Sequence, residues 1–136
     1  MLKVMAAAAI VFSLNACKKK DTAGSADITT LVQDGSWKVT EMRDSGTDKT
    51  SKFSDYTFTF SNGTVTGNKS GSTITGTYAH QMDDSHHELV LTFTSSSSFS
   101  ELSDDWEILE QSSTKIRLQD DSGSGSTNDL LTFEKK

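Results

Sequence analysis

The alternation of apolar and polar residues predicts an all-β domain of eight short antiparallel strands. From Trp37 onward, apolar residues recur at every second position, which is the period of a strand with one buried face. The strands are spaced by about ten to fourteen residues, with Gly, Ser, Asn and Asp between them and no helical pattern. A meander of eight strands exposes two long edges unless it closes, so we expect an eight-stranded antiparallel up-and-down barrel. A two-sheet sandwich is the alternative, because periodicity does not distinguish the two.

The first 16 residues have the three parts of a secretory signal. Lys3 provides the basic start, residues 4–14 are apolar, and small residues precede Cys17. The apolar run is shorter than the roughly 20 residues that cross a bilayer, and charge returns at Lys18. We therefore expect residues 1–16 to be removed on export.

Cys17 directly follows Leu14-Asn15-Ala16 and is the single cysteine of the chain. This pattern resembles the lipobox of bacterial lipoproteins. The resemblance implies that a peptidase cuts before Cys17, that its sulfur carries a diacylglyceryl group, and that the new amino terminus is acylated. More than one acyl chain is what stable membrane anchoring requires. The alternative is a secreted protein with a free thiol at this position.

The mature chain would be small and acidic. Removal of residues 1–16 takes away one of the 13 basic residues and none of the 19 acidic ones, so the formal charge of −6 becomes −7. An acidic chain without basic clusters beyond residues 18–20 is a poor partner for nucleic acid. We expect Cys17 and the polar residues up to 26 to form an acylated tether, and residues 27–136 to form one domain.

A short helix is expected at the start of the domain. Ile28, Leu31 and Val32 have helical spacing, with Asp27 placed as N-cap, and Asp34-Gly35 ends the helix. The first strand follows, with Trp37, Val39 and Glu41 on one face and Lys38, Thr40 and Met42 on the other. The remaining seven strands are expected around Tyr56-Phe58-Phe60, Val65, Ile74-Tyr78, Leu89-Leu91-Phe93, Trp106-Ile108, Ile116-Leu118 and Leu131-Phe133.

Two glycines suggest local geometry. Asn62-Gly63 separates two alternating segments, and this dipeptide favours the positive φ angles of a tight hairpin turn. Gly76 lies inside an expected strand, where it predicts a bend or a close approach of neighbouring backbone.

Gly35-Ser36-Trp37, at the head of the first strand, resembles the Gly-x-Trp signature of the lipocalins. The whole span 28–136 is also similar to lipocalin-like domains in lipoproteins of Bacteroidetes-type bacteria, chiefly in residues 36–45, 56–63, 102–106 and 131–135. The resemblance implies an eight-stranded barrel closed at one end by the N-terminal helix, with Trp37 packed there. It also implies a place in the cell envelope, anchored to the outer membrane. The second lipocalin signature has no good match, and the one candidate for the arginine that covers the tryptophan, Arg117, alternates with Ile116 and Leu118 and should point outward.

The barrel interior is the candidate binding site, because an eight-stranded barrel either fills with side chains or holds one small ligand. An aromatic lining favours a small hydrophobic ligand entering the open end. The alternative function is a non-catalytic envelope module with a solid core, which docks a protein or glycan through its loops. The side chains predicted to line the interior are Phe58, Phe60, Tyr78, Leu91, Phe93, Trp106 and Ile108.

No cluster predicts catalysis, a metal site or a cofactor. The three histidines fall within eight residues, but a solvated hairpin tip explains them better than a rigid zinc site. Residues 120–129 lack the Asp-x-Asp-x-Asp-Gly order of a calcium loop, and Asp104-Asp105 would point to opposite strand faces. Without a nucleophile motif we expect no enzyme. The histidine-rich segment comprises His80, Asp83, Asp84, His86 and His87.

Overall fold

The computed structural model describes residues 27–94, 98–120 and 127–136. The predictions for residues 1–16, for acylation of Cys17 and for the tether lie outside the described residues. The predicted first helix is confirmed as α1 (Ile28–Gln33), in which the side chain of Asp27 accepts a hydrogen bond from the Thr29 backbone N–H at 3.0 Å. Asp34 ends the helix, and Gly35 turns the chain with φ of 77°.

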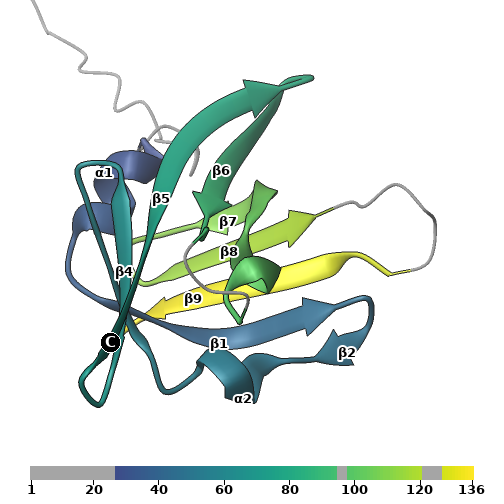
Figure 1. Cartoon of the computed structure of the whole chain (residues 1–136). Helices are drawn as coiled ribbons and strands as arrows, with labels where there is room; N and C mark the ends of the chain where they lie inside the picture. The colour runs from purple at the N-terminus through teal and green to yellow at the C-terminus, as the bar shows by residue number, and fades with distance from the viewer. Residues whose placement is uncertain (1–26, 95–97, 121–126) are drawn as a thin grey trace, which may run out of the picture.

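Eight antiparallel strands close into a barrel (Figure 1), which confirms the predicted fold class. Neighbours along the chain pair in order, and β9 pairs back onto β1, so the sheet closes rather than splitting into a sandwich. The two-residue strand β2 (Thr47–Asp48) folds back and pairs antiparallel with the last two residues of β1. The barrel strands are β1 (Trp37–Asp44), β3 (Thr57–Ser61), β4 (Thr64–Lys69), β5 (Ser72–Asp83), β6 (His86–Thr92), β7 (Asp104–Gln111), β8 (Lys115–Asp120) and β9 (Asp129–Lys135).

A bulge in β1 corrects the predicted alternation of the first strand. The pairing with β9 shifts register between Val39 and Glu41, so two residues of β1 face one of β9. Trp37, Val39 and Met42 are therefore buried, whereas Glu41 lies on the outer face. Strict period-two alternation had placed Glu41 with Trp37, and this prediction was wrong because one extra residue reverses the face of all that follow.

Both glycine predictions are confirmed. Asn62 and Gly63 have φ of 48° and 78°, which is the pair of positive angles of a two-residue hairpin turn. A Cβ on Gly76 would lie 2.5 Å from the Thr92 carbonyl oxygen and 2.7 Å from Cδ1 of Phe93. Only glycine allows β5 and the end of β6 to approach this closely.

Short helices cover both ends of the barrel. At the end where β1 begins, α1 buries Ile28 and Val32 against the core. At the opposite end, α2 (Thr50–Phe53) and a 3₁₀ turn over Ser100–Leu102 bury three side chains, those of Phe53, Phe99 and Leu102. The sequence pattern predicted no helix between strands, and it missed these two because each is a single turn.

Candidate functional site

The predicted interior residues lie inside the barrel. Phe58, Phe60, Tyr78, Leu91, Phe93 and Trp106 are at most 5% exposed, and Ile108 is half-buried beside them. A second bulge follows directly, between Ile108 and Glu110, and leaves Leu109 45% exposed. The structure thus places these side chains in one cluster, whatever their role in binding.

The aromatic rings of the interior pack against one another. Phe60 meets Tyr78 edge-on with ring centres 5.2 Å apart, and Phe133 at 5.9 Å. Phe58 meets Phe133 in the same way at 5.4 Å. Edge-to-face pairs at these separations are a favourable packing of a protein core. The lining that the sequence predicted for a ligand therefore has ring partners of its own.

A second aromatic group closes the end of the barrel opposite α1. The ring of Phe99 lies 5.3 Å from Phe53, 5.0 Å from Tyr56 and 5.3 Å from Phe93, measured between centres. Sequence reasoning missed Phe53 and Phe99 because both stand in connections, where the period of a strand gives no information on facing. Their position fills the mouth through which a ligand was expected to enter.

Among the described residues of the barrel interior, one side-chain hydroxyl lacks a hydrogen-bond partner. The hydroxyl of Tyr78 is buried and makes no hydrogen bond. The two indole N–H groups behave differently, since Trp37 donates to the Val32 carbonyl at 2.8 Å and Trp106 to the Leu102 carbonyl at 3.0 Å. A buried hydroxyl without a hydrogen-bond partner lowers the stability of the fold by about 1–3 kcal/mol. A ligand atom that formed a hydrogen bond with this hydroxyl would recover part of that free energy.

Trp37 is covered by a lysine rather than by an arginine. The ammonium group of Lys135 lies 4.8 Å from the centre of the Trp37 ring. Arg117 points outward, as its alternation predicted, and its guanidinium lies 3.6 Å from the Glu110 carboxylate. Lys135 could not be chosen from sequence, because its position over the ring depends on the pairing of β9 with β1.

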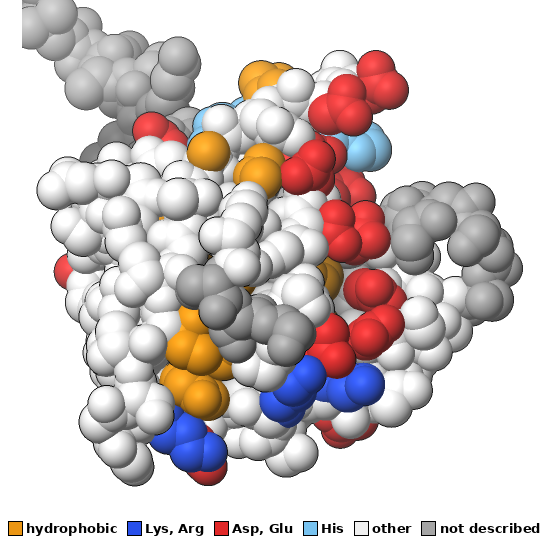
Figure 2. All heavy atoms as spheres, viewed as in Figure 1, with side chains coloured by type: hydrophobic (Ala, Val, Ile, Leu, Met, Phe, Trp, Pro, Cys, Tyr) orange, Lys and Arg blue, Asp and Glu red, His pale blue; other side chains and the backbone are white. Residues whose placement is uncertain are grey.

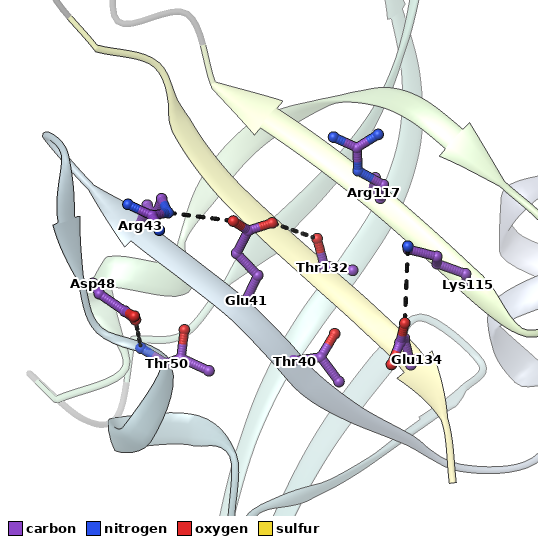
Figure 3. Close-up of a pocket in the computed structure, with 9 residues that line it drawn as sticks. All are labelled: Thr40, Glu41, Arg43, Asp48, Thr50, Lys115, Arg117, Thr132 and Glu134. Carbon is purple, nitrogen blue, oxygen red and sulfur yellow. Dashed lines mark hydrogen bonds and ion pairs between the residues drawn. The ribbon is translucent and has the colours of Figure 1, made fainter.

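The outer face of β1, β9 and β8 carries a polar groove of about 390 Å³ (Figure 3). Its central row follows the strand register: Glu41 of β1 faces Thr132 of β9, which faces Arg117 of β8. Thr132 is 4% exposed and donates a hydrogen bond to Glu41 at 3.3 Å, so it forms the floor. The groove is lined by Thr40, Glu41, Arg43, Asp48, Thr50, Lys115, Arg117, Thr132 and Glu134.

The charged groups around this groove are paired loosely. Arg43 lies 3.3 Å from Glu41, whereas Lys115 and Glu134 are 3.9 Å apart. These side chains are about 37–46% exposed, so each pair contributes little to stability and can reorient at small cost. Sequence reasoning did not find this site, because it expected binding inside the barrel or at the loops.

The histidine-rich segment forms the β5–β6 hairpin. His86 lies 3.2 Å from the Glu107 carboxylate, while Asp83 and Asp84 are exposed at the tip. Acidic side chains gather over this tip and along the neighbouring strands (Figure 2). No group of three or more His, Cys, Asp or Glu side chains that could hold a metal ion occurs among the described residues.

No family model matches the sequence, and no curated protein matches it. Within the described ranges, no helix is both long and apolar enough to cross a membrane.

Proposed function

We propose that this chain is a lipid-anchored, lipocalin-like protein of the bacterial cell envelope that binds a polar partner on its outer surface and catalyses no reaction. Cys17 would carry the acyl chains, and the polar residues after it would hold the domain close to the outer membrane. The barrel interior would have a structural role. The polar partner would bind in the groove over β1, β9 and β8.

The observation that carries this choice is the contrast between the two sites. Inside the barrel, the aromatic side chains pack against one another, and α1 and the Phe53–Phe99 pair cover its two ends. Outside, the groove of about 390 Å³ has the volume of a small-molecule pocket, which starts at about 300 Å³. Its floor of threonine hydroxyls and its rim of loosely paired charges favour a partner rich in hydroxyl or charged groups, such as a glycan or a protein loop.

Site-directed crosslinking in living cells tests this function. A photo-crosslinking residue in place of Thr40 would report on the groove, and the same residue in place of Thr66, on the outer face of β4, would serve as its control. We expect an adduct from position 40 alone. Arg117→Glu should abolish it, whereas Lys69→Glu on β4 should leave it intact. Equal adducts from both positions would contradict a binding role for the groove.

A small hydrophobic ligand inside the barrel is the second candidate, and the unpartnered hydroxyl of Tyr78 favours it. Such a ligand would place its one polar atom at this hydroxyl and its apolar part among Phe60, Leu91 and Trp106. It would have to displace Phe53 or Phe99 to enter. Titration with a fatty-acid panel, followed by Trp106 fluorescence, tests this; binding that Tyr78→Phe weakens would favour the interior site over the groove.

A further inference from the structure

The β5–β6 hairpin continues beyond the barrel as a two-stranded ribbon (Figure 1). β4 pairs with β5 only as far as Thr77, and β7 pairs with β6 only from Glu88 onward. Among the strands that the structure describes, residues from Gln81 to His87 therefore pair only with each other and with Glu88. All three histidines of the chain lie on β5 and β6, two of them within this ribbon and His80 at its base.

Two of these histidines meet ring to ring. Nε2 of His80 lies 2.9 Å from Nδ1 of His87, and the two ring planes differ by 7° with centres 5.1 Å apart. Rings stacked face to face at that separation would hold their nitrogen atoms further apart. The imidazoles therefore meet edge to edge, almost in one plane, with one ring donating its N–H to the lone pair of the other.

A thioether lies on the same face of the ribbon. Met82 is directly opposite His87 in the register, and it follows His80 by two positions, so all three side chains project from one face. Met82 is 60% exposed, although methionine is normally a core residue. His86 projects from the other face, toward Glu107.

We propose that His80, His87 and Met82 form a binding site for copper(I). The thioether sulfur is a soft donor that selects Cu(I), and imidazole nitrogens are good copper ligands, whereas the harder ions bind through oxygen. Zinc sites fix four ligands, commonly thiolate, imidazole or carboxylate, and no third residue of those types joins the two histidines among the described residues.

The metal would take the place of the shared hydrogen. Metal–imidazole bonds are about 2.0 Å long, so a copper ion held by both rings requires their nitrogen atoms to separate from 2.9 Å to about 3.5–4 Å, the shorter value for a trigonal site and the longer for a linear one. Side chains on an exposed ribbon can make this adjustment by small rotations. The donating imidazole moves its proton to its outward nitrogen, so two neutral histidines bind the ion without net proton release.

Competition with a chromophoric Cu(I) chelator under anaerobic, reducing conditions tests the site. The full chain would be produced without acylation and would carry Cys17→Ser, because the free thiol of its single cysteine would otherwise compete for copper. We expect one Cu(I) per chain. His80→Gln and His87→Gln should each lower the affinity at least a hundredfold, and Met82→Leu about tenfold. His86→Gln is the matched control, since it removes a histidine from the other face of the same hairpin and should change the affinity less than twofold.

X-ray absorption at the copper edge supplies an independent readout. The loaded chain should show two nitrogen neighbours and one sulfur neighbour, and Met82→Leu should remove the sulfur. Absence of Cu(I) binding in the Cys17→Ser chain would overturn the proposal. An equal loss of affinity in His86→Gln and His87→Gln would do so as well. Far-ultraviolet circular dichroism of every variant would check that the barrel is folded.

Discussion

Lys135 is paired with Trp37 across the closing strands and places its ammonium group 4.8 Å from the centre of the indole ring. The same ammonium group donates hydrogen bonds to the carboxylate and the backbone carbonyl of Asp34, which caps the end of α1. One cation thus joins the last strand, the first strand and the C-terminal end of the helix. It is stabilised there by the ring face and by the negative end of the helix.

Replacement of this lysine should loosen the closed barrel. We expect Lys135→Met to lower the free energy of unfolding by about 1–2 kcal/mol, because a partly buried cation–π contact and a contact with a helix end are both lost. Chemical denaturation followed by tryptophan fluorescence measures it. Lys38→Met is the control. Lys38 is the exposed residue next to Trp37 in β1, and its replacement should change the free energy of unfolding by less than about 0.5 kcal/mol.

Gly76 should tolerate no side chain. In Gly76→Ala the new Cβ would lie 2.5 Å from the Thr92 carbonyl oxygen, so β5 and β6 must move apart. Overpacking of this kind costs about 1–3 kcal/mol, and thermal unfolding should detect it. Thr77→Ala changes the adjacent, exposed residue and should leave the melting temperature nearly unchanged. A fully stable Gly76→Ala protein would show that the strands can separate without cost.

Removal of Phe99 should open the end of the barrel that it covers. We expect Phe99→Ala to cost about 3–5 kcal/mol, because its buried ring contacts Phe53, Tyr56 and Phe93. The apolar void should bind a small aromatic probe such as benzene. Leu109→Ala serves as control, since Leu109 is 45% exposed and its truncation leaves no void. Binding of the probe to the unmutated chain with equal affinity would contradict this role for Phe99.

The N-cap of α1 should make stability depend on pH. Hydrogen bonds from Thr29 lower the pKa of Asp27 below its usual value of 3.8. A carboxylate whose pKa is lowered by folding stabilises the folded state above the pKa of the unfolded chain, and this contribution is lost as the pH falls through the lowered value. Asp27→Ala should therefore lower the melting temperature at pH 7.

The difference between Asp27→Ala and the unmutated chain should shrink as the pH is lowered below about 4. Asp83→Ala removes the same charge from the exposed hairpin and provides the control for net charge. Melting temperatures of the three proteins across pH 3–7 measure the effect. A difference for Asp27→Ala that is constant across this range would assign the loss to helix propensity rather than to the charged cap.

Much of the barrel could be predicted because its signals are local. The alternation in Tyr56-Phe58-Phe60 and Leu89-Leu91-Phe93 predicted strands that the structure contains, and Asn62-Gly63 predicted the tight turn between β3 and β4. The candidate sites were harder to predict from the sequence. The burial of Phe99 and the formation of the groove around Thr132 depend on which segments contact each other across the barrel. The spacing of residues along the chain does not predict those contacts.

The sequence by itself determined the eight barrel strands, the first helix and most of the inward side chains, since the two-residue and 3.6-residue periods follow from the geometry of each element alone. Tertiary structure alone decided that Lys135 covers Trp37, that a bulge turns Glu41 outward into the groove, and that His80 meets His87. These relations depend on register between strands, and register is set by the packing of the whole closed sheet rather than by any single segment.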